Sequence, residues 1–436
     1  MKPMTTGASR CTFRCSIWDK EKLEQDLRPD FGPNLDLPRH GWFPFKEGFS
    51  ASLVSYILAH KFKQSPGLLF DPFLGSGTTA LEGSFWGWDA HGIEINPFLA
   101  FLSRVKTEKS YDAEYFYQIA RKISVERIKK INFRLPINTT LVERKGLKKW
   151  LFNHSVVKRF EKLRSAIWQN NTSLKYKNLM LLCLIRAMQD VANAKRDGKC
   201  WRYKRGWKFR NYDAIDLENA FRRHAEQYAE DLQLVREIPG NATIHLGDSR
   251  RLSLIDPIFK HRAFDVVITS PPYLNSFDYT DIYRPELLLM GAFRTSEELR
   301  KLRLQTLRSH VQVAWTKPKT CPFPEVRRIS QVIRGAQTWD RRIPEMVEAY
   351  FLDIDKIVAA CTRLVKPGGY LCFVVSNSAY AGIVVPVDEI LEQLFKRNGV
   401  YVLESRILRQ RRGNGYHQKK SQEKLREVLL IGQVLR

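Results

Sequence analysis

The sequence predicts an α/β protein in which a doubly wound sheet is interrupted by a helical insertion. Short apolar runs that end in tight turns lie at residues 67–94 and 242–273, and a long stretch of amphipathic helical patterns separates them. Further strand-like runs follow near the carboxyl terminus. Because 436 residues exceed the ~100 to 200 typical of one domain, we expect one core domain with one or more sizeable insertions.

The first part of the sheet is expected within residues 1–100. After a Pro- and Gly-rich segment, apolar spacing predicts a helix from Leu53 to Phe62. A short apolar run then ends at Asp71, a glycine turn follows, a helix opens near Thr78, and a second apolar run ends at Glu94. Strand, tight turn, helix and strand in this order form the first unit of a doubly wound sheet.

Residues 101–240 form the predicted insertion, a basic helical candidate for target recognition. Amphipathic patterns predict helices near 113–130, 148–168, 174–195 and 215–236. Between the last two lies a loop, residues 198–212, in which basic and aromatic side chains alternate. A merely solvated surface is the alternative, but this interleaving fits phosphate contact with base stacking better. The residues predicted to contact nucleic acid are Lys199, Trp201, Arg202, Lys204 and Arg205, with Tyr203, Trp207, Lys208 and Arg210 in the same loop.

Residues 241–436 are expected to complete the sheet. Apolar runs at 242–252 and 263–273 predict strands, and a basic, irregular segment at 292–343 interrupts the pattern as a second insertion. A long helix is expected from about Pro344 to Leu364, followed by a strand, a helix near 387–397 and two final strands. The basic loop RQRRGNGYHQKK, which joins those two strands, is a further candidate for contact with a phosphate backbone.

The composition indicates a polyanionic partner. Lys and Arg total 72 against 46 Asp and Glu, which gives a net charge of +26 and a pI near 9.8. This surplus exceeds what a protein with small neutral ligands needs, although a merely soluble basic surface is the alternative. Neutralisation of phosphates would supply much of the affinity, so binding should weaken as the salt concentration rises.

The sequence predicts a cytoplasmic protein without membrane contact. Its amino-terminal segment contains no apolar stretch that fits a signal peptide, and no run approaches the ~18 apolar residues that span a bilayer. The seven cysteines are scattered and lack the paired spacing of a zinc site. We therefore expect reduced thiols, Cys11 and Cys15 among them, and no metal site.

The turn DPFLGSG indicates a pocket for a nucleoside cofactor. Gly75 and Gly77 follow a strand and open a helix, where glycine allows a sharp turn and close approach of a ligand. With Ala80 the turn also satisfies the dinucleotide fingerprint, so an NAD enzyme stays an alternative. Glu94, at the end of the next strand, suits a ribose diol in either case.

The turn TSPPY, residues 269–273, distinguishes between these cofactor classes. Two consecutive prolines at a strand end remove two backbone donors and fix φ, which leaves carbonyl groups that must find partners outside the sheet. A rigid turn rich in acceptors beside an aromatic ring suits the amine of a nucleobase. The alternative is a strand terminator of two prolines with a packing tyrosine.

Together the two turns resemble those of the DNA amino-methyltransferases, which carry an F-x-G-x-G cofactor turn and a (D/N/S)-P-P-(Y/F/W) catalytic turn. The form that begins with Ser270 after Thr269 is similar to the cytosine-N4 branch, whereas Asp in the first position is usual for adenine-N6 enzymes. The resemblance covers roughly residues 40–100 and 240–436 and implies a class I methyltransferase (Rossmann-like) fold with S-adenosylmethionine as the cofactor. Residues 101–240 match nothing in this family, which leaves the place of sequence readout open.

The resemblance implies a role for each cofactor residue. Asp71 would meet the methionine ammonium, Phe73 would pack against the cofactor, and Gly75 and Gly77 would admit it. Thr78 and Thr79 would lie near its carboxylate, and Glu94 would bind the ribose. Asp248 would accept from the adenine amine, with a simple turn or helix-cap aspartate as the alternative. The segment Lys46 to Phe49 resembles the cofactor-lid motif.

The expected chemistry follows from the amine, whose lone pair is delocalised into the base. If the Ser270 hydroxyl and the Pro271 carbonyl accept its two hydrogens, electron density returns to nitrogen and the growing positive charge is stabilised. Because the amine is stacked and paired in duplex DNA, the base must be flipped out, and Tyr273 is the expected stacking surface beside Pro272. The catalytic residues are therefore predicted to be Ser270, Pro271, Pro272 and Tyr273.

Residues downstream of the catalytic turn are candidates for the walls of the base pocket, with a packing role equally compatible. They are Asn275, Phe277, Asp278, Tyr279 and Tyr283, of which Asn275, Asp278 and Tyr279 are predicted to bind substrate.

The predicted function is site-specific methylation of the N4 amine of cytosine in double-stranded DNA, within a restriction-modification or related system. A cognate restriction endonuclease is a candidate partner. The alternatives are an adenine-N6 DNA methyltransferase and an RNA base amino-methyltransferase, whose turns usually begin with Asp or Asn. A protein-glutamine methyltransferase would prefer Asn-Pro-Pro-Tyr and has little use for a charge of +26. An NAD oxidoreductase is disfavoured by the TSPPY turn and by the absence of a catalytic His or Tyr-Lys context. A non-catalytic DNA-binding module is disfavoured because both signature turns are intact.

Overall fold

The computed structural model describes residues 27–62, 65–123, 128, 130–136, 140–198, 200–235, 237–254, 259, 263–315, 321–411 and 424–435. Three predictions therefore concern residues outside the described part of the chain: the DNA contact of Lys199, the thiols Cys11 and Cys15, and the basic loop beyond Arg411.

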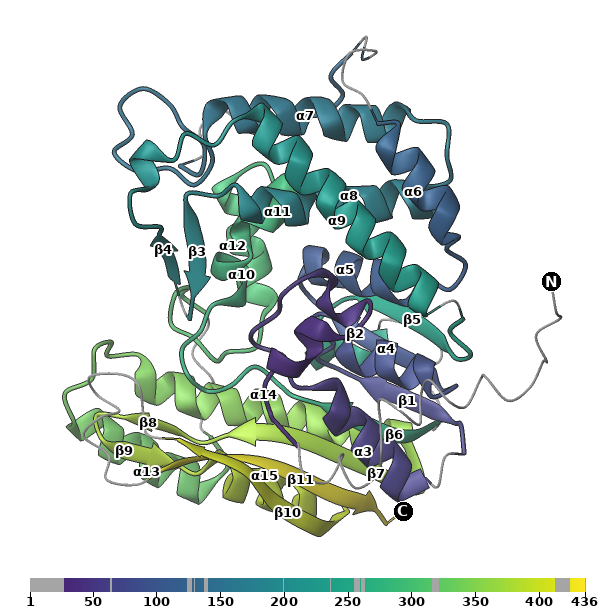
Figure 1. The fold of residues 1–436 in the computed structure, drawn as a ribbon. Coiled ribbons are helices and arrows are strands. Elements are labelled where there is room, and N and C mark those ends of the chain that lie inside the picture. Colours follow the sequence, from purple (N-terminus) through teal and green to yellow (C-terminus); the bar gives the residue numbers. More distant parts are fainter. Residues whose placement is uncertain are drawn as a thin grey trace, which may run out of the picture.

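The core is one seven-stranded sheet in the order β10-β11-β7-β6-β1-β2-β5 (Figure 1). Its strands are β1 (Leu68–Asp71), β2 (Asp89–Glu94), β5 (Asn241–Leu246), β6 (Phe264–Thr269), β7 (Val365–Ser376), β10 (Val400–Arg411) and β11 (Leu425–Val434). Neighbours from β5 to β7 pair in parallel, whereas β11 pairs antiparallel with both β7 and β10. This doubly wound sheet with a reversed strand near one edge has the class I methyltransferase fold, as predicted.

The two faces of the sheet are buried under different helices because successive residues of a strand point to opposite sides. One face packs against α3 (Ala51–Phe62) and α4 (Thr78–Phe85), and the other against α14 (Ile343–Leu364) and α15 (Val387–Arg397). In β6, for example, Val266 lies in the first core and Val267 in the second. The predicted helices and final strands of this part of the chain are confirmed to within a few residues.

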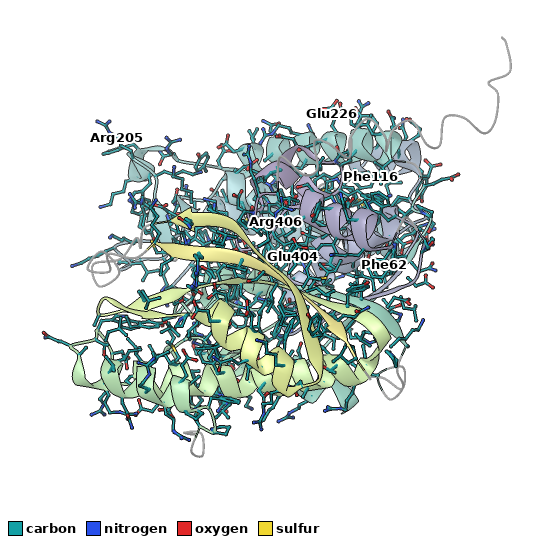
Figure 2. The ribbon with its side chains drawn as sticks, turned by 90° about the horizontal axis from the view of Figure 1, so that it is seen from below. Phe62, Phe116, Arg205, Glu226, Glu404 and Arg406 are labelled. Carbon is teal, nitrogen blue, oxygen red and sulfur yellow. The ribbon has the colours of Figure 1, made fainter. Side chains whose placement is uncertain are left out.

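The edge strand β10 is joined to α3 by polar contacts. The Arg406 guanidinium donates to the Tyr56 hydroxyl over 2.9 Å, and Lys61 pairs with Glu404 over 3.5 Å (Figure 2). The amino-terminal helix is thereby fixed against the last hairpin of the sheet.

A separate helical bundle lies beyond α5 (Pro97–Thr107), on one side of the sheet in Figure 1. It contains α6 (Ala113–Arg121), α7 (His154–Gln169), α8 (Leu174–Asp190) and α9 (Ala214–Leu234). The same core includes residues from α10 (Tyr279–Ile282), α11 (Arg284–Met290) and α12 (Ser296–Gln305). The chain that follows the catalytic turn is therefore buried under the insertion.

The prediction of a loop at 198–212 is wrong. Residues Ala194–Asp197 (β3) and Cys200–Tyr203 (β4) form an antiparallel hairpin, followed by a 3-10 turn, η3 (Trp207–Phe209). The helix predicted to 195 ends at Asp190, because backbone bonds from Asn193 to Leu151 and from Lys204 to Asn193 hold this stretch extended. The helix predicted to 130 likewise ends at Arg121.

The segment 292–343 is also more regular than predicted, since it contains α12 and α13 (Pro324–Gly335). A capping box opens α12, in which the Thr295 hydroxyl accepts from the Glu298 backbone and Glu298 reaches back to Thr295. The remaining short elements are η1 (Gly32–Asp36), η2 (His40–Trp42), η4 (Ser249–Leu254), β8 (Ser378–Tyr380) and β9 (Ile383–Val385). Among the described residues, no helix is both long and apolar enough to cross a membrane.

Candidate active site

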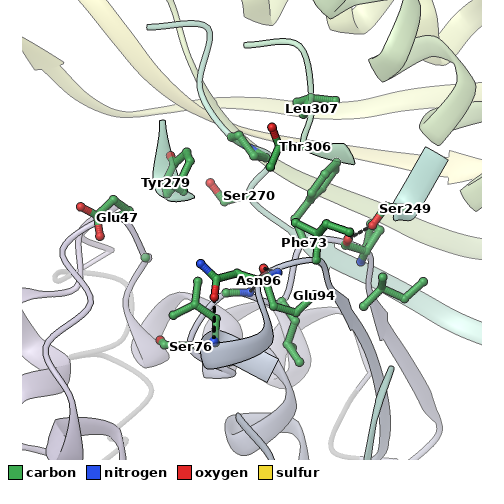
Figure 3. Close-up of a pocket in the computed structure, with 18 of the residues that line it drawn as sticks. Glu47, Phe73, Ser76, Glu94, Asn96, Ser249, Ser270, Tyr279, Thr306 and Leu307 are labelled. Atoms are coloured by element: carbon green, nitrogen blue, oxygen red, sulfur yellow. Dashed lines mark hydrogen bonds between the residues drawn. The ribbon is translucent and has the colours of Figure 1, made fainter. Parts of the chain in front are cut away.

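The strand order locates a crevice at the carboxyl ends of β1 and β6. From β1 the chain proceeds to β2 and β5 on one side, and it then crosses to β6 on the other side of β1. Ligands of doubly wound sheets bind where the order reverses in this way. A cavity lies there, and both Gly75 and Ser270 line it (Figure 3).

The glycine turn enters the cavity through Gly75. Its φ of 56° lies in the left-handed region, and its N–H donates to the Glu94 carboxylate over 2.7 Å. Gly77 also has a positive φ, 85°, but it is not among the lining residues. A Cβ at Gly77 would lie 2.8 Å from the Ser103 hydroxyl of α5, so this glycine allows close packing of two helices. Its predicted contact with the cofactor stays a prediction.

Asp71 ends β1 with a carboxylate that is 1 % exposed. One oxygen, Oδ1, accepts from the Phe73 N–H over 2.9 Å and from the Thr269 hydroxyl over 2.6 Å. The other oxygen, Oδ2, has no hydrogen-bond partner among the described residues. Burial raises the pKa of Asp71 to about 6, against the opposing effect of these donors. Asp71 is not among the residues that line the cavity, although the next two residues, Pro72 and Phe73, are. A buried carboxylate oxygen without a hydrogen-bond partner is suited to a cationic ligand.

Two neighbouring groups are also without partners, and both line the cavity. The Ser76 hydroxyl and the Asn96 side-chain nitrogen are buried, and no described residue bonds to either. Asn96 caps α5, where its Oδ1 accepts from the Phe98 and Leu99 N–H groups, so only its amide hydrogens remain available. These two donors suit an anionic group.

Glu94 lies at the end of β2 and faces the cavity, as Figure 3 shows. Its carboxylate accepts from two backbone N–H groups, those of Gly75 over 2.7 Å and Asn96 over 2.8 Å. Burial raises its pKa to about 7 despite these bonds. Of the other predicted cofactor residues, Phe73 and Thr78 line the cavity, whereas Thr79 lies behind it with its hydroxyl directed to Ile268 O.

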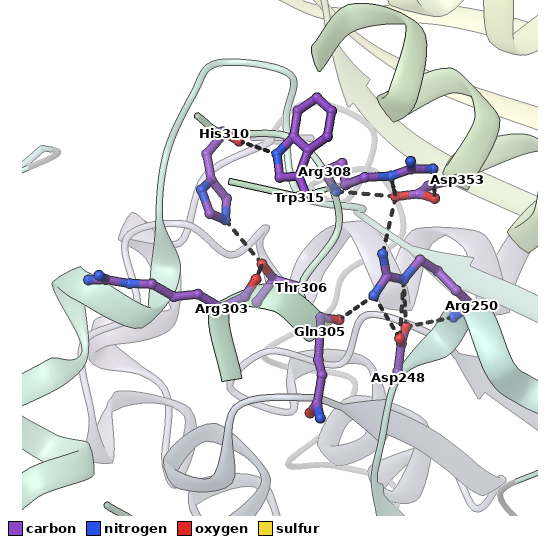
Figure 4. A network of polar contacts seen from close by, with 9 residues as sticks. All are labelled: Asp248, Arg250, Arg303, Gln305, Thr306, Arg308, His310, Trp315 and Asp353. Atoms are coloured by element: carbon purple, nitrogen blue, oxygen red, sulfur yellow. Dashed lines mark hydrogen bonds and ion pairs between the residues drawn. The ribbon is translucent and has the colours of Figure 1, made fainter. Parts of the chain in front are cut away.

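Asp248 lines the cavity while its carboxylate is already paired. Arg250 binds both of its oxygens, with the closest pair of atoms 2.8 Å apart, and also reaches Gln305 O over 2.9 Å (Figure 4). The backbone N–H of Arg250 donates to the Asp248 side chain, as in a turn. The alternative that Asp248 is a turn residue therefore accounts for part of what this side chain does. The carboxylate retains lone pairs for a further donor.

The segment 305–310 forms a further wall of the cavity that the sequence did not reveal. Asp353 of α14 holds it by accepting from Arg308 Nε over 2.9 Å and from Arg250 over 3.5 Å (Figure 4). The Ser276 N–H donates to Ser309 O over 3.0 Å, which ties the wall to the chain after the catalytic turn. The wall residues that line the cavity are Gln305, Thr306, Leu307, Ser309 and His310.

The catalytic turn presents Ser270 and Pro272 to the cavity, whereas Pro271 is buried. Burial raises the pKa of Tyr273, and a hydrogen bond from Ser270 opposes that rise, so these two side chains are in contact. Tyr273 itself is half-buried and does not line the cavity, but Tyr279 does and faces Ser270 (Figure 3). The stacking role of Tyr273 stays a prediction.

The other predicted pocket residues have structural partners. Asp278 caps α10 by accepting from the Thr280 N–H over 2.9 Å, and it pairs with Arg303 over 2.8 Å. Tyr283 is fully buried and donates to Glu47 over 2.6 Å, which places the Glu47 carboxylate of the lid segment at the cavity. Asn275 and Phe277 are not lining residues.

The hairpin residues predicted to contact DNA divide into two groups. Trp201 packs against the bundle and donates to Ile282 O over 3.2 Å, and Lys204 donates to Asp190 O over 2.9 Å. Arg202 and Arg205 are exposed, although Arg202 pairs with Asp197 over 2.5 Å. None of these four residues lines the cavity.

Some site residues carried a usable signal and others did not. Ser76 and Asn96 stand beside predicted site residues at the carboxyl ends of β1 and β2, so their position in the strand pattern could have identified them. Arg250 lies two residues after the predicted site residue Asp248, so its position could have identified it as well. Thr306 and His310 lie in a segment without a motif, and only the packing of α14 brings them to the cavity.

Comparison with known proteins agrees with this geometry. No protein-family model matches the chain. It is 27% identical over 446 residues to the type II methyltransferase M.BsoBI of Geobacillus stearothermophilus, covering 87% of this chain and 82% of that protein. It is 26% identical over 434 residues to M.AvaI of Nostoc sp., covering 92% and 87%, and 22% identical over 376 residues to M.MvaI of Kocuria varians, covering 77% and 76%. The predicted resemblance to methyltransferases of this kind is confirmed, and the cytosine-N4 branch stays a prediction.

Proposed function

We propose that this chain is an S-adenosylmethionine-dependent methyltransferase that modifies an exocyclic amine of a base in double-stranded DNA, with the N4 amine of cytosine as the favoured target. Similarity to type II methyltransferases along most of the chain supports DNA methylation. The observation that carries the proposal is that the glycine turn and the Ser-Pro-Pro turn, almost two hundred residues apart, line one cavity.

The cavity fits S-adenosylmethionine at its charged groups. Asp71, which directly precedes the cavity-lining Pro72, has a buried acceptor, Oδ2, without a partner among the described residues, which suits an ammonium group. The Ser76 hydroxyl and the Asn96 amide are buried donors without partners, which suit a carboxylate. Glu94 and Asp248 would take the ribose hydroxyls and the adenine amine at the other end. When bound there, the cofactor supplies an electrophilic methyl group.

The chain's own contribution to the chemistry is to hold the amine and stabilise charge. Ser270 Oγ and the Pro271 carbonyl would accept the two amine hydrogens, which increases electron density on the nitrogen. Such preorganised partners typically contribute ~3 to 4 kcal/mol to transition-state stabilisation. Tyr279 lines the cavity opposite Ser270 and offers an apolar face for an extruded base.

Adenine-N6 methylation is the second candidate, because the same acceptors would hold the N6 amine of adenine. The serine at position 270, where adenine-N6 enzymes usually carry aspartate, favours cytosine. A serine hydroxyl accepts a hydrogen bond but is a far weaker base than a carboxylate, so the proton that the amine loses as its nitrogen bonds to the methyl carbon would pass to water.

Product analysis tests the proposal directly. The protein and methyl-labelled S-adenosylmethionine are incubated with double-stranded DNA in one reaction and with RNA in another. The labelled nucleosides are then identified after hydrolysis. Label in N4-methyldeoxycytidine is the expected result. Label in N6-methyldeoxyadenosine would show that adenine is the target base. Label confined to RNA would overturn the proposal.

A further inference from the structure

We propose that the turn after β4, residues 204–210, is a contact surface for duplex DNA, in which Phe209 presses against the bases and Arg205, Lys208 and Arg210 bind phosphates. The inference rests on the proposed function for the identity of the nucleic acid. It replaces the expectation that Trp201 and the neighbouring aromatic rings supply the stacking surface.

The aromatic rings of the hairpin are already used to attach it to the protein. Trp201 packs on the bundle and donates to Ile282 O. The Trp207 ring packs edge-on against Trp150, with 4.9 Å between centroids, and lies 4.9 Å from Tyr203. These three rings therefore form an anchor and are not available for stacking with bases.

Phe209 is different, because 87% of its surface is exposed, more than for any other exposed large hydrophobic residue among those described. The backbone around it is ordered by hydrogen bonds from Phe209 N to Gly206 O over 2.9 Å and from Trp207 N to Lys204 O over 3.1 Å. One exposed hydrophobic residue does not by itself indicate a partner. The inference depends on the cations beside Phe209, which one partner would cover together with the ring.

The charge around Phe209 identifies that partner as polyanionic. Residues 198–212 contain no Asp or Glu. Arg205, Lys208 and Arg210 are exposed, and the described part of the chain places no carboxylate at ion-pair distance from them. Figure 2 shows Arg205 at the outer edge of the molecule. Cations flanking an apolar ring match the phosphates and the base stack of DNA.

The β3–β4 hairpin is attached beside the cavity near its turn, and residues 204–210 leave it at the opposite end, after Tyr203. Arg196 of β3 forms a buried ion pair with Glu286 and lies 4.3 Å above the Tyr283 ring. Lys46, next to the cavity-lining Glu47, donates to Arg196 O over 3.3 Å. The hairpin therefore connects the surroundings of the cavity with the turn at 204–210, which would hold the duplex while the target base enters the cavity, and Phe209 would support the disturbed stack.

The test compares DNA binding by Phe209→Ala, Phe209→Trp and the neutralised variant Arg205→Gln/Lys208→Gln/Arg210→Gln. Binding is measured by fluorescence anisotropy with a labelled mixed-sequence duplex, the same single strand and a duplex RNA, over a range of salt concentrations. We expect Phe209→Ala to weaken duplex binding roughly ten-fold or more and Phe209→Trp to restore it. The neutralised variant should reduce the slope of log affinity against log salt by about 2 to 3.

Two control variants separate this effect from general surface changes. Leu234→Ala removes another exposed apolar side chain, 59% exposed, at the opposite end of α9, roughly 30 Å along the helix. Lys396→Gln/Arg397→Gln removes two exposed cations from the end of α15. Both should bind duplex DNA nearly as the unaltered protein does.

The outcomes distinguish this inference from the proposed function. If the unaltered protein methylates DNA but Phe209→Ala binds and methylates the duplex unchanged, the turn at 204–210 is not a DNA contact and the proposed function stands. Weakened binding of RNA alone would also overturn the inference. If the unaltered protein neither binds nor methylates DNA, the proposed function and the inference both fail.

Discussion

The Thr269 hydroxyl donates a 2.6 Å hydrogen bond to Asp71 Oδ1, so the last residue of β6 is bonded to the last residue of β1. Thr269 directly precedes Ser270 of the catalytic turn, and Asp71 begins the cofactor turn. The two halves of the proposed active site are therefore joined at the switch point of the sheet by one buried bond. A substitution in either turn should therefore affect the other turn.

Thr269→Val should weaken cofactor binding, because it removes this donor and keeps the shape of the side chain. Asp71 Oδ1 would then accept a hydrogen bond from the Phe73 N–H and no longer from Thr269. The pKa of Asp71 should therefore rise above about 6. Calorimetric binding of S-adenosylmethionine at several pH values would show the midpoint of the pH dependence shifted upward. Thr362→Val on α14, which removes a bond to Val358 O, is the matched control. An unshifted midpoint would show that the Thr269 hydroxyl does not influence the Asp71 carboxyl.

Asp71→Asn should abolish tight cofactor binding without destabilising the protein. The buried Oδ2 has no partner, and the raised pKa corresponds to about 3 kcal/mol of unfavourable burial when the carboxyl is ionised. The amide removes this charge and keeps the acceptor for Thr269 and Phe73. We expect at least a ten-fold loss of cofactor affinity and an equal or higher melting temperature near neutral pH. A marked loss of stability would show that the carboxylate is a structural group.

The contribution of Asp71 and Glu94 to the stability of the ligand-free protein should fall as the pH rises. The folded-state pKa values of Asp71 and Glu94, about 6 and about 7, lie above their ordinary values because of burial. Protonated carboxyls thus favour the folded state, and this contribution is complete below about pH 4 and is lost as the pH passes through about 7. The increase in melting temperature caused by S-adenosylhomocysteine, whose ammonium would pair with Asp71, should grow over the same range. In Asp71→Asn this growth should be much smaller.

Ser270→Ala should lower the rate of methyl transfer by roughly 100- to 1,000-fold, the usual effect of removing one preorganised hydrogen-bonding group. The hydroxyl is half-buried at the cavity and bonds only to the neighbouring Tyr273 among the contacts described above, so cofactor binding should change by less than a few fold. Single-turnover rates with labelled cofactor measure the effect, and Ser296→Ala on exposed α12 serves as the control. Full activity of Ser270→Ala would remove this turn from the mechanism.

Alanine at the two glycines of the cofactor turn should have different effects. Both have positive φ, which costs roughly 1–2 kcal/mol for a side chain. At Gly77 the new Cβ also meets Ser103 of α5 at 2.8 Å, so the free energy of unfolding should fall most there. Gly75 lines the cavity, so Gly75→Ala should mainly lower cofactor affinity. Denaturant unfolding and calorimetry would distinguish these outcomes, and the reverse ranking would contradict them.

Asp353→Asn should loosen the wall formed by residues 305–310. Asp353 is buried and accepts from both Arg308 and Arg250, so its loss leaves two partly buried guanidinium groups with weaker partners. We expect a loss of about 1–3 kcal/mol in the free energy of unfolding and a raised KM for cofactor. Asp355→Asn on the same helix, where the carboxylate contacts Asn398, is the control. An unchanged KM would show that the wall does not form part of the cofactor site.

The sequence by itself determined the sheet, the two turns and the class of cofactor. Strands that end at Asp71, Glu94 and Thr269 are recognisable because apolar runs and turn residues are local properties of the chain, and parallel strands must bring their carboxyl ends to one edge. Local spacing also placed α15 and the final strands correctly.

Only the tertiary structure decided which side chains serve the site and which serve the packing. Trp201 and Tyr283 have the residue types of a binding surface. They pack instead in the core that the insertion shares with the chain after the catalytic turn, where Tyr283 is buried and Trp201 is partly buried. Phe209 has no motif, and the geometry of the hairpin leaves it exposed. Thr306 and His310 reach the cavity because Asp353 attracts Arg308, a contact between distant segments that no local pattern encodes. Burial and pairing depend on the whole fold, and a linear pattern can indicate only the types of residue available for them.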